Sequence, residues 1–209
     1  MLWESDLIRD IRTTPEMDDQ DRWIQGFHSK YGEDVRIQTI WWDEVTDCNR
    51  QKIADRFLQV RDNCQAILEI GVNRNGDNST THCFLDNKRP DTIYVGLDIQ
   101  DKSSLDDPTK NIFTIKASSR DVAKNIEIMK SLGVVEFGFI FIDGDHSLTS
   151  VLNDWEYTAL LAPNGIVGFH DVSTHPGPSC FIRAINKDKW HVEENLCPDD
   201  WGVGFCWKK

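Results

Sequence analysis

A loop with two glycines follows the first strongly apolar run of the sequence. In the segment LEIGVNRNGDNST, Glu69 stands in that run, Gly71 follows its end, and Gly76 lies further along the loop. Glycine lets a backbone approach a bound molecule closely, and the unpaired amides of a helix that begins near Ser79 can donate hydrogen bonds to it. Because open α/β sheets bind their ligands at such strand ends, the segment predicts a cofactor site.

An acidic residue ends the next apolar run, YVGLDIQD. The carboxylate of Asp98 is suited to accept hydrogen bonds from the two hydroxyls of a ribose. A dinucleotide site would carry the pattern G-x-G-x-x-G, but the second position after Gly71 is Asn73, which disfavours NAD. The two segments therefore predict an adenosine-type cofactor, with the alternative that Asp98 only caps the end of its strand.

Short apolar runs alternate with segments of helical periodicity from about residue 60 onwards. The runs are rich in β-branched and aromatic residues, which is typical of buried strands. The predicted strands are 66–70, 92–97, 111–115, 137–142 and 165–170, and the predicted helices are 79–85, 120–132 and 148–161. Repeated alternation of strand and helix predicts a parallel sheet covered on both faces.

The two ends of the chain differ from this central pattern. Residues 1–60 are polar, with tryptophans and helical periodicity, which predicts a helical cap that could help to cover a ligand. Beyond residue 175 we expect a loop at THPGPSC, a short helix at FIRAINK and an antiparallel hairpin of KWHVEENL and WGVGFCWKK. No linker, repeat or charge block divides the sequence. We therefore expect a single domain over 1–209, with the binding core in 61–175 and the hairpin region in 176–209.

The glycine loop and Asp98 together resemble the first motifs of the class I S-adenosylmethionine-dependent methyltransferases. The resemblance implies an α/β fold with a Rossmann-like, doubly wound, mostly parallel sheet and an antiparallel C-terminal strand. It also implies S-adenosyl-L-methionine as the cofactor. The segment NIFTIKASSRD resembles the adenine pocket of the catechol O-methyltransferase branch. The cofactor-binding residues that the resemblance implies are Glu69, Gly71, Asn73, Gly76, Ser79, Asp98, Ile99, Ser119, Arg120 and Asp143.

Two later segments, FIDGDHSL and GFHDV, resemble the fourth and fifth strands of metal-dependent O-methyltransferases, especially macrolide sugar O-methyltransferases and cephalosporin hydroxylase relatives. The metal ligands that this resemblance implies are Asp143, His170 and Asp171. The chain departs from the pattern at His170, where the relatives commonly carry a carboxylate. Oxygen ligands suit Mg²⁺, whereas an imidazole favours Mn²⁺, Fe²⁺ or Zn²⁺, so we expect Mg²⁺ or Mn²⁺ here. The alternative is that the two carboxylates only cap loops.

His146 stands three residues after Asp143, at the position of the general-base histidine in the macrolide sugar methyltransferases. The resemblance therefore implies that His146 removes a proton from the acceptor hydroxyl. We expect a helix that begins at Ser147 to keep this imidazole neutral, because a helix N-terminus disfavours positive charge, and we expect Asp145 to orient the ring. The other histidines are expected at the surface or in the core, and these include His28, His82, His175 and His191.

Composition and charge exclude several classes of partner. Lys+Arg 23 against Asp+Glu 35 gives a formal net charge of −12, which repels nucleic acid and anionic membranes at long range. We recognise no apolar run of about 18 residues and no signal peptide, so we expect a cytoplasmic chain, with homo-oligomerisation left open. The six cysteines contain no C-x-x-C pair, and most are expected to be small buried hydrophobic residues.

The sequence as a whole predicts an O-methyltransferase that acts on a sugar or another small hydroxylated acceptor. One alternative is a metal-dependent hydrolase or oxygenase that uses Asp143, His146, His170 and Asp171. The metal-binding facial triad of an oxygenase, however, would require the pattern His-x-Asp, whereas His170 and Asp171 are adjacent. The other alternative is a cofactor-binding module without catalysis. In the cap, Trp41 or Trp42 could face the ligand.

Overall fold

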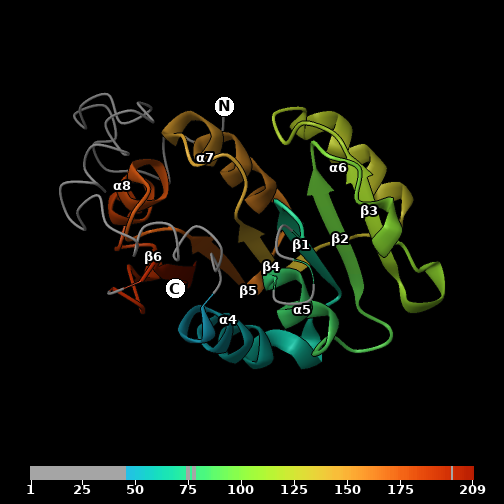
Figure 1. Ribbon diagram of the computed structural model, residues 1–209, viewed down its shortest axis with the longest axis horizontal. Coiled ribbons are helices and arrows are strands. Elements are labelled where there is room, and N and C mark those ends of the chain that lie inside the picture. Colours follow the sequence, from blue (N-terminus) through green and yellow to red (C-terminus); the bar gives the residue numbers. More distant parts are fainter. Residues whose placement is uncertain (1–45, 74–75, 77–78, 199) are drawn as a thin grey trace.

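The computed structural model describes residues 46–73, 76, 79–198 and 200–209 (Figure 1). Most of the predicted cap, with Trp41 and Trp42, lies outside the described residues, as does His28. Within the described part, the cap consists of helix α4, Asp47–Val60, whose N-cap residue Thr46 accepts a hydrogen bond from the backbone of Asn49. The helical periodicity of this segment is therefore confirmed from residue 47 onwards.

The strands among the described residues form one seven-stranded sheet, in the order β3-β2-β1-β4-β5-β7-β6. Strands β1 to β5 are parallel, whereas β7 runs antiparallel to both β5 and β6. The bounds are β1 Ala66–Ile70, β2 Ile93–Asp98, β3 Ile112–Lys116, β4 Phe137–Ile142, β5 Leu161–His170, β6 Trp190–Glu193 and β7 Val203–Lys208. This topology confirms the predicted doubly wound, mostly parallel sheet with an antiparallel C-terminal strand.

Helices cover both faces of the sheet (Figure 1). On one face α4 and α5 bury Phe57 and Phe84 against Phe139 of β4. On the other face α6, α7 and α8 form a second core, in which Trp155 of α7 packs on Phe181 of α8. The bounds are α5 Thr80–Leu85, α6 Val122–Ser131, α7 Leu148–Trp155 and α8 Pro176–Ala184, with short 3-10 turns at Arg61–Asn63, Ser103–Leu105, Pro108–Lys110 and Glu156–Leu160.

Two helices differ from their predicted bounds by more than two residues. The predicted helix 148–161 is α-helical only to Trp155 and continues as a 3-10 turn, Glu156–Leu160. Helix α8 begins at Pro176, inside the segment THPGPSC that we expected to be a loop. Proline fits the first turn of a helix because its missing N–H has no partner there. The start of α8 is therefore set by that proline, and the helix ends before Lys187.

A disulfide bond joins Cys48 of α4 to Cys197, in the connection between β6 and β7. The expectation that most cysteines are small buried residues is confirmed by the four free ones, which are Cys64, Cys83, Cys180 and Cys206, whereas the disulfide itself was not predicted. Such bonds are typical of oxidising compartments, so the expected cytoplasmic location stays a prediction. Among the described residues, none of the helices has the length and apolar character needed to cross a bilayer.

Candidate active site

Gly71 brings the glycine loop against the end of β4. Its φ angle is +85°, and a Cβ atom at this position would lie 2.0 Å from the carbonyl oxygen of Asp143. The backbone amide of Asp143 in turn donates to the carbonyl of Ile70 at 2.8 Å. The sequence predicted these two segments as separate motifs, and the structure places them in contact.

Two described residues of the glycine loop, Asn73 and Ser79, make polar contacts with each other and with α5. Asn73 has a positive φ of 50°, and its amide donates to Oγ1 of Thr81 at 2.9 Å. The hydroxyl of Ser79, the N-cap residue of α5, donates to Oδ1 of Asn73 at 3.0 Å. Gly76 also has a positive φ, +61°. These contacts fix the loop as the connection from β1 to α5, while direct cofactor contacts of its residues stay predictions.

Glu69 is fully buried at the end of β1. One carboxylate oxygen accepts from Oγ1 of Thr80 at 2.7 Å and the other accepts from the hydroxyl of Tyr94. Burial disfavours the ionised form and raises the pKa of Glu69 to about 7, against the opposing effect of these hydrogen bonds. Glu69 therefore links β1 to α5 and to β2 by hydrogen bonds, and these contacts help to position the glycine loop between β1 and α5.

Asp98 ends β2 beside the same loop. Its Oδ2 accepts from the amide of Val72 at 2.9 Å and its Oδ1 accepts from the amide of Gln100 at 2.7 Å. The alternative of a capping role is thus present in the structure. Each carboxylate oxygen can accept a second hydrogen bond, so the cap and the predicted ribose contact are compatible. The following residue, Ile99, is 72% exposed and offers an apolar surface next to this carboxylate.

Ser119 and Arg120 lie in the connection from β3 to α6. The carbonyl of Ser119 accepts from the hydroxyl of Tyr157 at 2.8 Å. The guanidinium of Arg120 donates to Oγ of Ser150 at 2.9 Å and lies 3.6 Å from Oδ2 of Asp145. The contact of Ser119 links this connection to the 3-10 turn after α7, and those of Arg120 link it to the start of α7. The adenine contacts predicted for both residues stay predictions.

Two carboxylates and two imidazoles meet at the ends of β4 and β5, and we call Asp143, His146, His170 and Asp171 the His/Asp cluster. Nε2 of His146 lies 2.9 Å from Oδ2 of Asp171 and 3.6 Å from Oδ1 of Asp143. Nδ1 of His170 lies 3.2 Å from Oδ1 of Asp143 and 3.4 Å from Oδ1 of Asp171. The structure therefore brings together the three predicted metal ligands and the predicted base.

The charges of this cluster reverse one expectation. Burial disfavours a charged imidazole, but the carboxylates of Asp171 and Asp143 outweigh it and raise the pKa of His146 to about 10. His170 likewise has a pKa raised well above its ordinary value by the same two carboxylates, against burial. His146 is thus positively charged in the metal-free chain, contrary to the expectation that the helix N-terminus keeps it neutral.

Asp145 does not orient His146, contrary to the expectation from the sequence. Its Oδ1 accepts from the amide of Ser147 at 3.0 Å, and its Oδ2 accepts from the hydroxyl of Ser150 at 2.8 Å. These contacts shape the first turn of α7. The carboxylate nearest to the His146 ring is that of Asp171, in the segment after β5, and that of Asp143 is the next.

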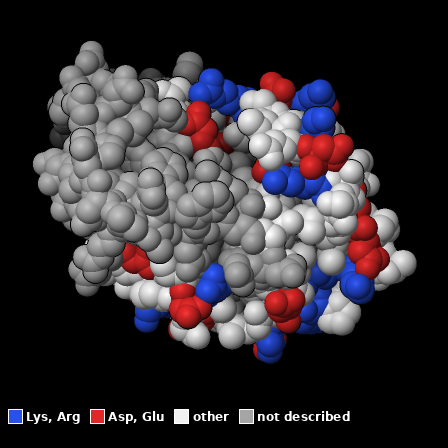
Figure 2. All heavy atoms as spheres, viewed as in Figure 1, with Lys and Arg blue, Asp and Glu red and all other residues white. Residues whose placement is uncertain are grey.

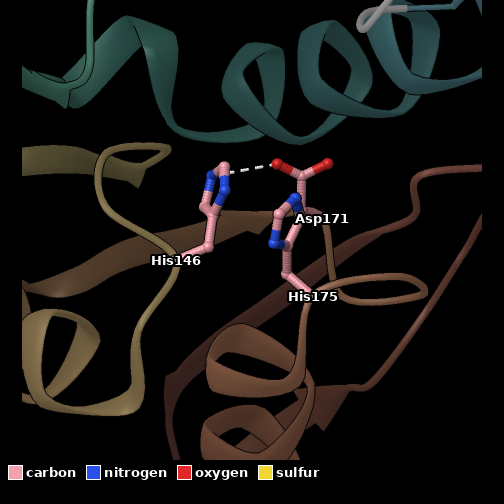
Figure 3. A group of neighbouring side chains, drawn as sticks. All are labelled: His146, Asp171 and His175. Atoms are coloured by element: carbon pink, nitrogen blue, oxygen red, sulfur yellow. Dashed lines mark ion pairs between the residues drawn. The ribbon is translucent and has the colours of Figure 1, made fainter. Parts of the chain in front are cut away.

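His175 is a neighbour of the cluster that sequence reasoning missed. Its ring lies next to that of His146, with the centroids 4.1 Å apart (Figure 3). Its backbone amide donates to the carbonyl of Asp171 at 2.9 Å. Burial and the charge of His146 lower the pKa of His175 to about 4. The signal that could have found it is its spacing, four residues after Asp171 and directly before the helix-starting Pro176.

The donor atoms fit a divalent cation. Among the described residues, two groups bring their possible ligand atoms within 4.8 Å of one another: Asp143, His170 and Asp171, and His146, Asp171 and His175. Nε2 of His170 is buried without a hydrogen-bond partner among the described atoms. The first group is the set implied from the sequence, and the second contains His175, which was expected at the surface or in the core.

Comparison with known families decides the class of protein. A family described as "Methyltransferase domain" matches residues 65–172, about half of the chain, from β1 to the residue after Asp171. The chain belongs to this family. The resemblance to class I S-adenosylmethionine-dependent methyltransferases is thereby confirmed, and the hydrolase, oxygenase and non-catalytic alternatives are disfavoured.

Solved structures of O-methyltransferases share the fold. MycE, from the mycinamycin biosynthetic pathway, was solved with Mg, SAH and mycinamycin VI and has a TM-score of 0.53 at 20% identity, over 94% of this chain and 55% of that one. The Bacillus cereus O-methyltransferase, solved with SAH, has a TM-score of 0.55 at 13% identity, and the match covers 96% of this chain and 94% of that one. CalS11, a TDP-rhamnose 3′-O-methyltransferase of calicheamicin biosynthesis, has a TM-score of 0.57 at 13% identity, and the match covers 94% of this chain and 98% of that one.

This chain therefore spans about half the length of MycE. No curated protein matches the chain in sequence.

Proposed function

We propose that this methyltransferase acts on a hydroxyl group of a sugar or another small acceptor, with the assistance of a divalent metal ion. The observation that carries the proposal is the contact between Gly71, in the predicted cofactor loop, and Asp143, in the His/Asp cluster. A cofactor at the ends of β1 and β2 would lie next to this cluster. The O-methyltransferase folds with bound SAH, and with Mg in MycE, support the same combination.

The cofactor would be held by residues around the ends of β1 and β2. When bound, S-adenosylmethionine supplies an electrophilic methyl group. The carboxylate of Asp98 would accept hydrogen bonds from the ribose hydroxyls while it still accepts those from the amides of Val72 and Gln100. Ile99 offers its exposed side chain to the adenine. Glu69 fixes the loop through Thr80 and Tyr94, and its predicted contact with the cofactor stays a prediction.

Asp143, His170 and Asp171 would hold the metal ion. When bound, a divalent ion supplies positive charge that lowers the pKa of an acceptor hydroxyl. In this proposal His146 would accept the hydroxyl proton. To do so its ring must first lose its own proton, which requires that the negative charges of Asp143 and Asp171 be offset. The chemistry of His146 therefore depends on the same carboxylates that would hold the ion.

Calorimetric titration with S-adenosylhomocysteine tests the cofactor half of the proposal. Asp98→Ala should weaken binding by about 1.5 to 3 kcal/mol, because two hydroxyls lose a charged acceptor. The matched control is Asp91→Asn, at an exposed acidic residue before the other end of β2, which should bind like the wild type. Equal affinity of Asp98→Ala and wild type would contradict the placement.

Methyl transfer to a panel of free sugars, nucleotide sugars and glycosides, detected by mass spectrometry, tests the other half. A chelator should abolish turnover, and Mg²⁺ or Mn²⁺ should restore it in the wild type but not in Asp143→Asn. His146→Ala should lower kcat by about 10² to 10⁴ while cofactor affinity stays nearly unchanged. Full turnover in the presence of the chelator would remove the metal from the proposal.

A further inference from the structure

The proposed function leaves one neighbour of the His/Asp cluster without a task, namely His175. Its ring lies next to that of His146, tilted by 45° with the centroids 4.1 Å apart, and close to the carboxylate of Asp171 (Figure 3). These three residues bring their possible ligand atoms within 4.8 Å of one another. They form a second donor set that shares only Asp171 with the set of Asp143, His170 and Asp171.

The second set differs from the first in its chemistry. It offers two imidazoles and one carboxylate, whereas the first offers two carboxylates and one imidazole. Imidazole nitrogen suits Zn²⁺, Co²⁺ and related transition metals, whereas Mg²⁺ prefers oxygen ligands, of which the first set offers more than the second. Two histidines with one carboxylate are also a known set of protein ligands for Zn²⁺. The two sets would therefore select different ions.

The backbone holds the second set in place. Asp171 adopts a positive φ of 60°, and its carbonyl accepts from the amides of Thr174 and His175, which makes a tight turn into α8. At the start of α8, a Cβ atom on Gly177 would lie 2.1 Å from the carbonyl oxygen of His146. The loop with His146 and the turn with His175 are therefore packed backbone to backbone. Behind His175, the buried Trp201 stacks on its ring with centroids 6.3 Å apart.

We propose that His146, Asp171 and His175 bind a divalent transition-metal ion of the Zn²⁺ class, and that this ion inhibits methyl transfer. The inhibitory consequence rests on the proposed function, in which His146 accepts the proton. A neutral imidazole has one nitrogen that can accept, so a ring that ligates an ion cannot also take a proton. The shared Asp171 makes the two ions compete.

A spectroscopic titration with Co²⁺ tests the site without any need for an acceptor or for cofactor. Wild type should bind Co²⁺ with visible absorption of a nitrogen-ligated ion, and Zn²⁺ should displace it. His175→Gln should weaken Co²⁺ binding by at least about tenfold, since a ligand is lost. Asp143→Asn, which removes a ligand of the other set only, should keep Co²⁺ binding within a few-fold. His191→Gln, on exposed His191 of β6, is the matched control, and thermal unfolding checks that each variant is folded.

The proposal is overturned if His175→Gln binds Co²⁺ as tightly as the wild type. It is also overturned if Asp143→Asn loses Co²⁺ while His175→Gln keeps it, because the ion would then occupy the other set. Where turnover is available, Zn²⁺ should inhibit the Mg²⁺-supported reaction, and His175→Gln should raise the half-inhibiting Zn²⁺ concentration by the factor seen with Co²⁺. Absence of S-adenosylhomocysteine binding would contradict the proposed function and leave the Co²⁺ result standing.

Discussion

Gly71 has the tightest surroundings of any glycine in the cofactor loop. A side chain there meets both a positive φ and the backbone of Asp143. Gly71→Ala should therefore lower the free energy of unfolding by more than about 2 kcal/mol, because the left-handed conformation alone costs about 1 to 2 kcal/mol and the clash adds to it. Urea denaturation measures the change.

Gly76 provides the matched control for that substitution. It has a positive φ of 61°, but a Cβ atom there would have no neighbour within 4 Å. Gly76→Ala should cost only the conformational part, about 1 kcal/mol. Equal losses in the two variants would show that the contact with Asp143 is not what requires glycine at position 71.

Glu69 gives the stability of the fold a dependence on pH. Its pKa is raised from 4.5 to about 7 by burial, so the folded protein holds this proton more tightly than the unfolded chain does. The protonated Glu69 contributes its full stabilisation below about pH 4.5, and this contribution is lost as the pH rises through about 7. The difference in the free energy of unfolding is on the order of 3 kcal/mol. Glu69→Gln should remove this difference. Denaturation curves of both proteins at pH 5 and pH 8 decide it, and parallel profiles would contradict the prediction.

At the scale of residues, the sequence predicted those contacts that depend only on position at a strand end. Asp143, His170 and Asp171 come together because β4 and β5 are parallel neighbours with their carboxyl ends at one edge. The contact of His146 with Asp171 and the contact of His175 with His146 depend instead on the turn at Asp171. The positive φ of Asp171 that makes this turn could not be predicted from the residue types. The expectation of a neutral His146 was wrong because the contacts with the carboxylates of Asp171 and Asp143 raise its pKa.

Helix α7 is positioned by its N-cap, which directly follows His146. The hydroxyl of Ser147 accepts from the amide of Ser150. Ser147→Ala should lower the free energy of unfolding by about 1 kcal/mol, whereas Ser147→Asp, which keeps an accepting oxygen, should stay close to the wild type. Chemical denaturation of the two variants checks this, and an equal loss in both would assign the effect to something other than the cap.

At the scale of elements, buried runs were predictable and irregular ends were not. The bounds of β1 and β4 match the prediction because each run is apolar over nearly its whole length and both strands are buried along it. Strand β5 begins at Leu161, before the predicted 165, and its pairing with β4 shifts register between Phe137 and Phe139. Such an irregularity depends on the neighbouring strand, which sequence periodicity does not contain.

For the whole molecule, the disulfide is a long-range covalent link. It joins Cys48 and Cys197, which are separated by 149 residues, so it restricts the unfolded chain strongly. Cys48→Ser should lower the free energy of unfolding by about 2 to 5 kcal/mol. Reductant should lower the stability of the wild type by the same amount and leave the variant unchanged. A wild type that is indifferent to reductant would contradict this role.

The charged side chains of the described residues do not form a single patch of one sign on the face that Figure 2 shows. There, basic and acidic side chains of the described residues lie interspersed. The expected exclusion of nucleic acid therefore rests on the net charge of −12 and stays a prediction.

The position of β7 has a consequence for the order in which the sheet can be built. Although β7 comes last in the sequence, it lies inside the sheet, between β5 and β6. During synthesis one edge of β5, next to the candidate active site, keeps unpaired backbone hydrogen-bonding groups until residues 203–208 have emerged and can pair with it. Nascent chains that stall before this point would expose a long apolar strand edge, which is the kind of surface that chaperones bind and that aggregates seed from.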